Sequence, residues 1–94
     1  MKIVKAKWAL KHAKEINIID VRSPDEFNSS HIEGAKNIPL PGIMMNAEHL
    51  LDKSKEYYLI CHSGARSMRA YSHLEVEGFD VVQIEGGNSA IGLS

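Results

Sequence analysis

The scarcity of cysteine, of long apolar runs and of net charge excludes several classes of function. It contains one cysteine, so an intramolecular disulfide is excluded and nothing points to an oxidising compartment. No apolar run approaches the length of a membrane-spanning helix, and the start lacks the long hydrophobic core of a signal peptide. A net charge of −1 gives no general attraction to nucleic acid or to an anionic membrane. We therefore expect a cytoplasmic protein with no nucleic-acid or membrane partner.

The pattern of apolar residues predicts an α/β protein with a mainly parallel sheet. Ninety-four residues suffice for one core and no repeat or linker divides them, so residues 1–94 are expected to form a single domain. Short apolar runs predict strands, and apolar residues at helical spacing predict helices between them. The strands are expected at 2–4, 16–21, 36–39, 57–60 and 79–84, and the longer helices at 5–15, 43–51 and 67–77.

Capping signals mark three further helix boundaries. Ser23 is a suitable N-cap with Glu26 three residues after it, so a short helix is expected from Pro24. Gly78 is expected to close the helix before it in a left-handed conformation. A last short helix is expected to begin at Asn88 or Ser89.

The single cysteine occupies a position suited to a nucleophile. Cys61 follows the apolar strand at 57–60 and is separated by a short loop from the start of a helix. Free backbone N–H groups and the positive end of the helix dipole favour an anion there. A thiolate at this place should have a lowered pKa and react near neutral pH. The alternative is that Cys61 is simply a small buried hydrophobic residue.

Neighbouring residues favour the reactive alternative. Gly64 allows the loop to turn its amides inward, and Ser63 and Ser67 supply hydroxyl groups. Arg66 supplies a fixed positive charge. It could bind an anionic substrate, which we favour with Arg69 as a weaker second charge, or it could pair with nearby acidic residues.

A second polar group is expected at the same edge of the sheet. Asp20 and Cys61 both lie at the carboxyl ends of predicted strands, where open α/β sheets bind ligands. Asp20 and Arg22 could orient the loop that holds Cys61. We favour the alternative that they form a structural ion pair at the strand end.

Three segments together resemble the rhodanese-like domain family over nearly the whole chain. The first is Asp20-Val21-Arg22-Ser23-Pro24-Asp25-Glu26-Phe27, followed by residues 30–35 and Asn37-Ile38-Pro39. The second is Cys61-His62-Ser63-Gly64-Ala65-Arg66-Ser67, which is similar to the family's active-site loop. The third runs from Gly78-Phe79 to Gly86-Gly87. Each segment is moderately specific, and their order and spacing make the resemblance highly specific.

The resemblance implies a parallel five-stranded sheet flanked by helices and a sulfurtransferase activity. Cys61 would take a sulfane sulfur from a donor such as thiosulfate or polysulfide, form a persulfide and pass the sulfur to a thiol or cyanide. His62, Ser63, Gly64, Ala65, Arg66 and Ser67 would surround the persulfide and bind the substrate. A protein persulfide is a further candidate partner. No cofactor or metal is implied.

Two positions depart from the family pattern. Ile91 stands four residues after the double glycine, where a tryptophan is usual, and Ser30 stands where many members have glycine before the histidine. We expect the first to reduce aromatic packing near the C-terminus and the second to change one loop torsion preference. Neither change affects the proposed chemistry.

Other functions fit the residues less well. Cysteine-dependent phosphatases and arsenate reductases usually place five residues between cysteine and arginine, whereas four separate Cys61 from Arg66. A non-catalytic interaction module would suit a chain without the cysteine. The histidines, His12, His31, His49, His62 and His73, lack the paired spacing of a zinc site. We expect His31 to anchor its loop through hydrogen bonds and His62 to act as a donor at the mouth of the site.

Overall fold

All five strands of the central sheet run parallel, which confirms the predicted α/β fold. The structure is a computed structural model and describes residues 1–93. The strands are β1 (Ile3–Lys5), β2 (Asn17–Asp20), β3 (Lys36–Asn37), β4 (Glu56–Ile60) and β5 (Asp80–Glu85). They lie in the order β1-β5-β4-β2-β3, so β4, the strand that leads into Cys61, is in the middle.

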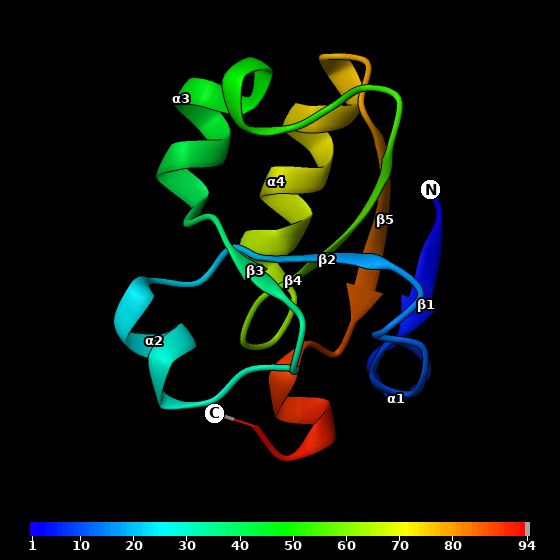
Figure 1. Cartoon of the computed structure of the whole chain (residues 1–94), viewed down its shortest axis with the longest axis vertical. Coiled ribbons are helices and arrows are strands. Elements are labelled where there is room, and N and C mark those ends of the chain that lie inside the picture. Colours follow the sequence, from blue (N-terminus) through cyan, green and yellow to red (C-terminus); the bar gives the residue numbers. More distant parts are fainter. Residues whose placement is uncertain (94) are drawn as a thin grey trace.

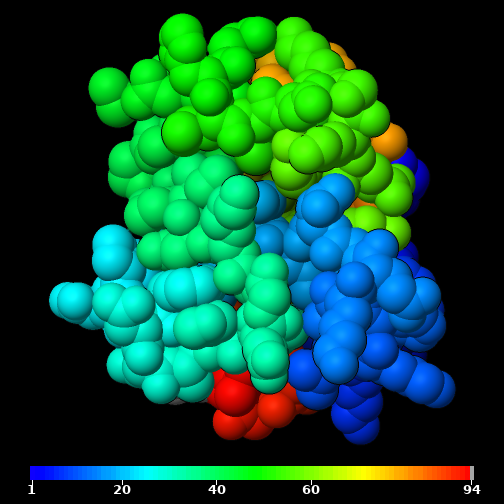
Figure 2. Space-filling view, viewed as in Figure 1, coloured from blue at the N-terminus to red at the C-terminus, as the bar shows by residue number. Residues whose placement is uncertain are grey.

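Helices cover both faces of this sheet (Figure 1). They are α1 (Ala6–Lys11), α2 (Pro24–Ser29), α3 (Leu40–Leu50), α4 (Ala65–Val76) and the 3₁₀-helix η1 (Asn88–Ile91). Helices α3 and α4 lie side by side, and α1 contacts η1. In the same orientation, Figure 2 shows the green segment that includes α3 above the cyan segment that includes α2, with the red C-terminal segment below. No helix among residues 1–93 is long and apolar enough to span a bilayer.

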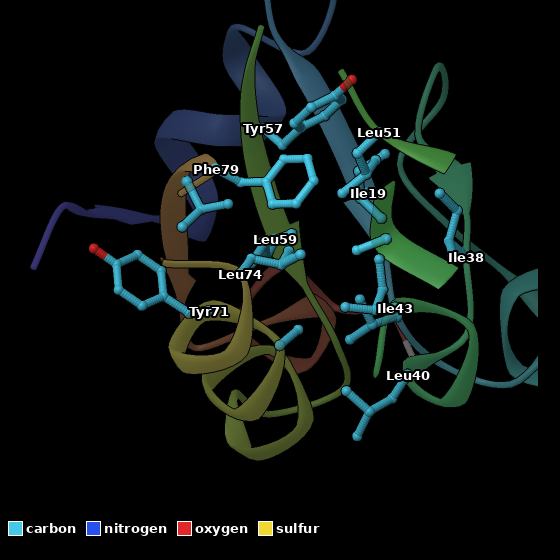
Figure 3. Close-up of a cluster of buried hydrophobic side chains, with 14 of the residues drawn as sticks. Ile19, Ile38, Leu40, Ile43, Leu51, Tyr57, Leu59, Tyr71, Leu74 and Phe79 are labelled. Atoms are coloured by element: carbon cyan, nitrogen blue, oxygen red, sulfur yellow. The ribbon is translucent and has the colours of Figure 1, made fainter. Parts of the chain in front are cut away.

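Alternate residues of the buried strands supply two separate hydrophobic clusters. Ile19 and Leu59 pack with residues of α3 and α4, and Figure 3 shows this cluster between helices and sheet. Ile18 and Ile60, the neighbours of those two residues, pack with residues of α1 on the other face. Because successive side chains of a strand point to opposite faces, a central parallel strand needs apolar residues at consecutive positions.

Several predicted boundaries were wrong by a few residues. The first helix ends at Lys11 and not at residue 15, because residues 12–15 turn the chain back towards β2. Helix α3 begins at Leu40, before the predicted start, since Pro39 is its N-cap and Pro41 occupies its first turn, where no intrahelical N–H bond is lost. Helix α4 begins at Ala65, two residues before its predicted start.

The predicted capping signals are confirmed. The side-chain oxygen of Ser23 accepts a hydrogen bond from the Glu26 N–H, and the Glu26 carboxylate accepts one from the Ser23 N–H. Gly78 follows α4 with a φ of 92°, the left-handed conformation expected of a C-terminal cap. Ser30 has an extended backbone with a φ of −167°, which any residue adopts, so the expected effect of losing a glycine there was wrong.

A buried ion pair fixes the end of β2. Asp20 and Arg22 are both 0% exposed, and Arg22 Nε and Nη2 donate to the Asp20 carboxylate at 3.0 and 2.8 Å. Arg22 Nη2 also donates to the Ser30 carbonyl at 2.6 Å, which ties the loop after α2 to the strand. This confirms the structural ion pair that we favoured from the sequence.

We predict that Asp20→Asn lowers the free energy of unfolding by about 3–5 kcal/mol, because it leaves the Arg22 charge buried without its carboxylate. Chemical denaturation of the variant measures this loss. Lys2→Ala is the matched control. Lys2 Nζ pairs with Glu56 and Asp80 on the surface, and exposed pairs of this kind contribute less than about 1 kcal/mol. Equal losses in both variants would contradict the assignment of the buried pair.

Candidate active site

The loop after β4 curls around the sulfur of Cys61. The amide of Gly64 donates to Cys61 Sγ at 3.1 Å and the amide of Ser67 donates to it at 3.3 Å. The hydroxyl of Ser67 lies 3.4 Å from the same sulfur. Gly64 has a φ of 119°, which only glycine adopts readily, and this conformation lets the chain turn into α4 directly after the loop. The loop therefore directs its polar hydrogens inward, as we predicted for an anion.

The segment after β5 holds the backbone of Cys61 and His62 through hydrogen bonds. The amide of Asn88 donates to the Cys61 carbonyl at 2.9 Å, and the amide of Ser89 donates to the His62 carbonyl at 2.9 Å. A side chain on Gly87 would lie 2.5 Å from both carbonyl oxygens, closer than any real contact. Glycine is therefore required where these two segments meet.

Asn88 also links the cysteine to the buried ion pair. Its side-chain amide Nδ2 lies 3.3 Å from the Asp20 carboxylate and 3.3 Å from the Cys61 carbonyl, and it donates to both. Asp20 therefore contributes to positioning Cys61 as well as to holding Arg22. The two roles that we considered for the pair are compatible.

The thiol is buried but surrounded by groups that favour its ionised form. Cys61 is 1% exposed, and burial alone raises the pKa of a thiol. The hydrogen bonds from the Ser67 hydroxyl and from the amides of Ser67, Gly64 and Arg66 act in the opposite direction and outweigh burial, so the pKa of Cys61 lies below its ordinary value. Cys61 thus has the burial of a small hydrophobic residue and the electrostatic surroundings of a nucleophile.

Arg66 is held by an acidic residue of α2. Its Nη1 and Nη2 donate to the two carboxylate oxygens of Glu26 at 2.6 and 2.9 Å. This bidentate bond lowers the pKa of Glu26 to about 2 and raises that of Arg66. The geometry matches the alternative in which Arg66 pairs with a nearby acidic residue. Binding of a donor anion by Arg66 stays a prediction.

A groove of about 440 Å³ lies beside this ion pair. Arg66 and Arg69 line it together with Val21, Ser23, Pro24 and residues 39–41. The groove reaches the start of α4 at Arg66, and its two guanidinium groups, one of them paired with Glu26, make it a candidate binding place for an anion.

The remaining residues of the Cys61 loop differ in exposure, and His31 lies in a different loop. His62 and Ser63 are exposed, whereas Ser67 is fully buried at the start of α4. His31 stacks on Phe27, and its Nδ1 lies 2.7 Å from the Phe27 carbonyl oxygen, which confirms its predicted role in anchoring its loop. Among residues 1–93, no three His, Cys, Asp or Glu side chains form a group that could hold a metal ion.

Three residues of the site had no predicted role in it. Glu26 was assigned only to capping α2, Asn88 only to starting a helix, and Gln83 only to a strand. Gln83 is buried in β5 and donates from Nε2 to the Gly64 carbonyl at 3.2 Å. The available signal was its position between apolar residues in a buried strand, since a buried polar side chain needs a hydrogen-bond partner.

Comparisons with known proteins agree with this geometry. The sequence matches the family model described as "Rhodanese-like domain" over residues 5–93. It is 42% identical over 82% of this chain and 74% of the other to "Putative sulfurtransferase YtwF" of Bacillus subtilis. It is 34% identical over 83% of this chain and 77% of the other to "Thiosulfate sulfurtransferase GlpE" of Shewanella oneidensis.

A solved structure extends the agreement to three dimensions. The crystal structure of a rhodanese-like domain protein from Staphylococcus aureus superimposes with a TM-score of 0.88 and 34% identity, covering 98% of this chain and 92% of that one. Since the family match spans nearly all of the sequence and the fold agrees with it, the chain belongs to the rhodanese-like domain family.

Proposed function

We propose that the protein is a sulfurtransferase that works through a persulfide on Cys61. The observation that carries this proposal is the set of inward-pointing donors around Cys61 Sγ at the end of the central strand. The names of the relatives YtwF and GlpE support the same class of activity. Residues 1–94 are proposed to act as a single domain in this function.

The reaction proceeds in two transfers between sulfur atoms. The Cys61 thiolate attacks the outer sulfur of thiosulfate, a new S–S bond forms, and the bond to the departing group breaks to release sulfite with its electron pair. An acceptor thiolate then attacks the outer sulfur of the Cys61 persulfide and carries it away, which restores the Cys61 thiolate. Cyanide as acceptor gives thiocyanate in the same way. No oxidant or reductant is consumed.

The loop contributes by stabilising negative charge on sulfur at both stages. Donors placed in advance around a buried atom cost little reorganisation when charge develops on that atom. The amides of Gly64, Arg66 and Ser67 form this ring, Ala65 lies within the same loop, and the exposed residues His62 and Ser63 are proposed to meet the arriving substrate. No general base is needed, because a thiolate is already ionised.

The substrates are proposed to be small. The groove beside Arg66 and Arg69 suits an anionic donor such as thiosulfate or polysulfide, and the acceptor is a thiol, a cyanide ion or the thiol of a partner protein. Because Cys61 is 1% exposed, a donor reaches the sulfur only after a local opening of the loop. A reducing compartment such as the cytoplasm keeps the free thiol available.

We predict that thiosulfate adds one sulfur atom to the protein and that cyanide or a thiol removes it, as seen by intact-protein mass spectrometry. Cys61→Ser is expected to fold but to take up no sulfur, because a hydroxyl is far less ionised than a thiol at neutral pH. A wild-type protein that stays unmodified with thiosulfate and polysulfide, or a serine variant that is modified, would contradict the proposal.

We predict that Cys61 reacts with iodoacetamide as a thiol of lowered pKa. Thiolate is lost as the pH falls through the pKa, so the alkylation rate should fall with it, and its midpoint should lie below the value of about 8.5 for a free cysteine. The pH dependence of the rate, compared with that of a cysteine-containing peptide, gives this midpoint. A midpoint at or above that of the peptide would refute the electrostatic role of the loop.

Glu26→Gln is predicted to raise kcat/KM for thiosulfate by roughly two- to fivefold, since it releases the Arg66 guanidinium from its carboxylate and removes a negative charge beside the groove. A neutral organic trisulfide should show no such gain. Glu48→Gln is the matched control, because Glu48 pairs with Lys53 at 3.0 Å on the exposed side of α3. A fall in thiosulfate use by folded Glu26→Gln would show that the pair of Arg66 and Glu26 serves only to anchor the start of α4 to α2.

A further inference from the structure

Gln83 presents an amide from the middle of the sheet to the loop around Cys61. The residue is 4% exposed, and its Nε2 donates to the Gly64 carbonyl at 3.2 Å. The orientation of the amide follows from this contact, because a carbonyl can only accept. Gln83 Oε1 is then buried without a hydrogen-bond partner among residues 1–93. A buried acceptor in this state costs free energy, so a contribution to the site would account for the amide's presence.

The Gly64 carbonyl accepts three hydrogen bonds. It accepts from the Ser67 hydroxyl at 3.1 Å, from Gln83 Nε2 at 3.2 Å and from the Met68 amide at 3.0 Å. The same Ser67 hydroxyl lies 3.4 Å from Cys61 Sγ. A hydroxyl carries one hydrogen, so Ser67 can donate either to the Gly64 carbonyl or to the sulfur, but not fully to both.

The choice depends on the charge of the sulfur. In the thiol form, the S–H of Cys61 donates to Ser67 Oγ, and Ser67 donates to the Gly64 carbonyl. When the thiol gives its proton to solvent, the sulfur becomes an acceptor only. The Ser67 hydroxyl then gains most by rotating to donate to the thiolate, since hydrogen bonds to charged groups are the stronger ones. That rotation takes a donor away from the Gly64 carbonyl.

We propose that Gln83 is a positioning residue that frees the Ser67 hydroxyl to donate to the Cys61 thiolate. Its Nε2 stays on the Gly64 carbonyl after Ser67 has turned away, so the peptide unit that begins α4 keeps its place. The Gly64 amide therefore remains directed at the sulfur while the negative charge is present. The same arrangement serves the persulfide anion. The inference extends the proposed function but depends only on Cys61 working as a thiolate.

The proposal is tested by the pH dependence of iodoacetamide alkylation in a double-mutant cycle. Gln83→Met keeps the length of the side chain and removes its donor, and Ser67→Ala removes the hydroxyl. Each single variant should move the alkylation midpoint upward by roughly 0.5–1 pH unit, the size expected for losing one hydrogen bond. In the Ser67→Ala background, Gln83→Met should add almost nothing, because no hydroxyl remains to be freed. Additive shifts, or no shift in Gln83→Met, would overturn the proposal.

Two further measurements distinguish this positioning role from a general loss of packing in the domain: the denaturation midpoint of Gln83→Met, and the alkylation of a control variant on the other face of the sheet. Gln83→Met should keep or raise the denaturation midpoint, because it removes the unpartnered Oε1 along with the donor. Ile84→Val loses one buried methyl group in the cluster on the opposite face and should leave the alkylation midpoint unchanged. If Gln83→Met does not fold, Gln83→Asn, which keeps the amide but falls one methylene short, replaces it with the same expected shift. Alkylation needs no sulfur donor, so the result stands apart from the test of sulfur transfer.

Discussion

The hydrogen bonds to Cys61 Sγ are the interaction on which the remainder of the site depends. A sulfur anion buried to 1% exposure would be strongly disfavoured if it lay against apolar groups alone. The amides of Gly64 and Ser67 and the Ser67 hydroxyl replace the water that the anion has lost. A fixed set of donors thus allows a buried thiol to have a lowered pKa, and the fold has to keep those donors directed at one atom.

The fold does this by holding the loop from several sides at once. The segment at Gly87 and Asn88 fixes the carbonyls of Cys61 and His62, and Gln83 holds that of Gly64. Arg66 anchors the start of α4 to Glu26 of α2, whose first turn is itself closed by a capping box. These supports come from α2, which precedes the loop in the sequence, and from β5 and η1, which follow it, and they meet at the carboxyl end of the sheet (Figure 1). The direction of the loop's donors towards Cys61 Sγ therefore depends on the whole domain fold.

The sequence predicted local structure and the position of Cys61 at the end of a buried strand better than it predicted the contacts between distant residues. Consecutive apolar residues at 18–19 and 59–60 identified buried parallel strands, and Ser23 and Gly78 identified helix boundaries, because these signals depend on neighbouring residues. The start of α3 was missed since Pro39 and Pro41 suit a strand end and a first helical turn equally well. The contacts of Arg66 with Glu26 and of Gln83 with Gly64 join residues 40 and 19 positions apart, and no periodicity encodes such contacts.

The most direct test of this account is a crystal structure of the protein after treatment with thiosulfate. We expect a second sulfur atom bonded to Cys61 Sγ, lying inside the loop within hydrogen-bonding distance of its amides, with the Gln83 amide still on the Gly64 carbonyl. A persulfide whose outer sulfur points away from the amides, or a loop that turns its N–H groups outward when the sulfur is added, would contradict the account.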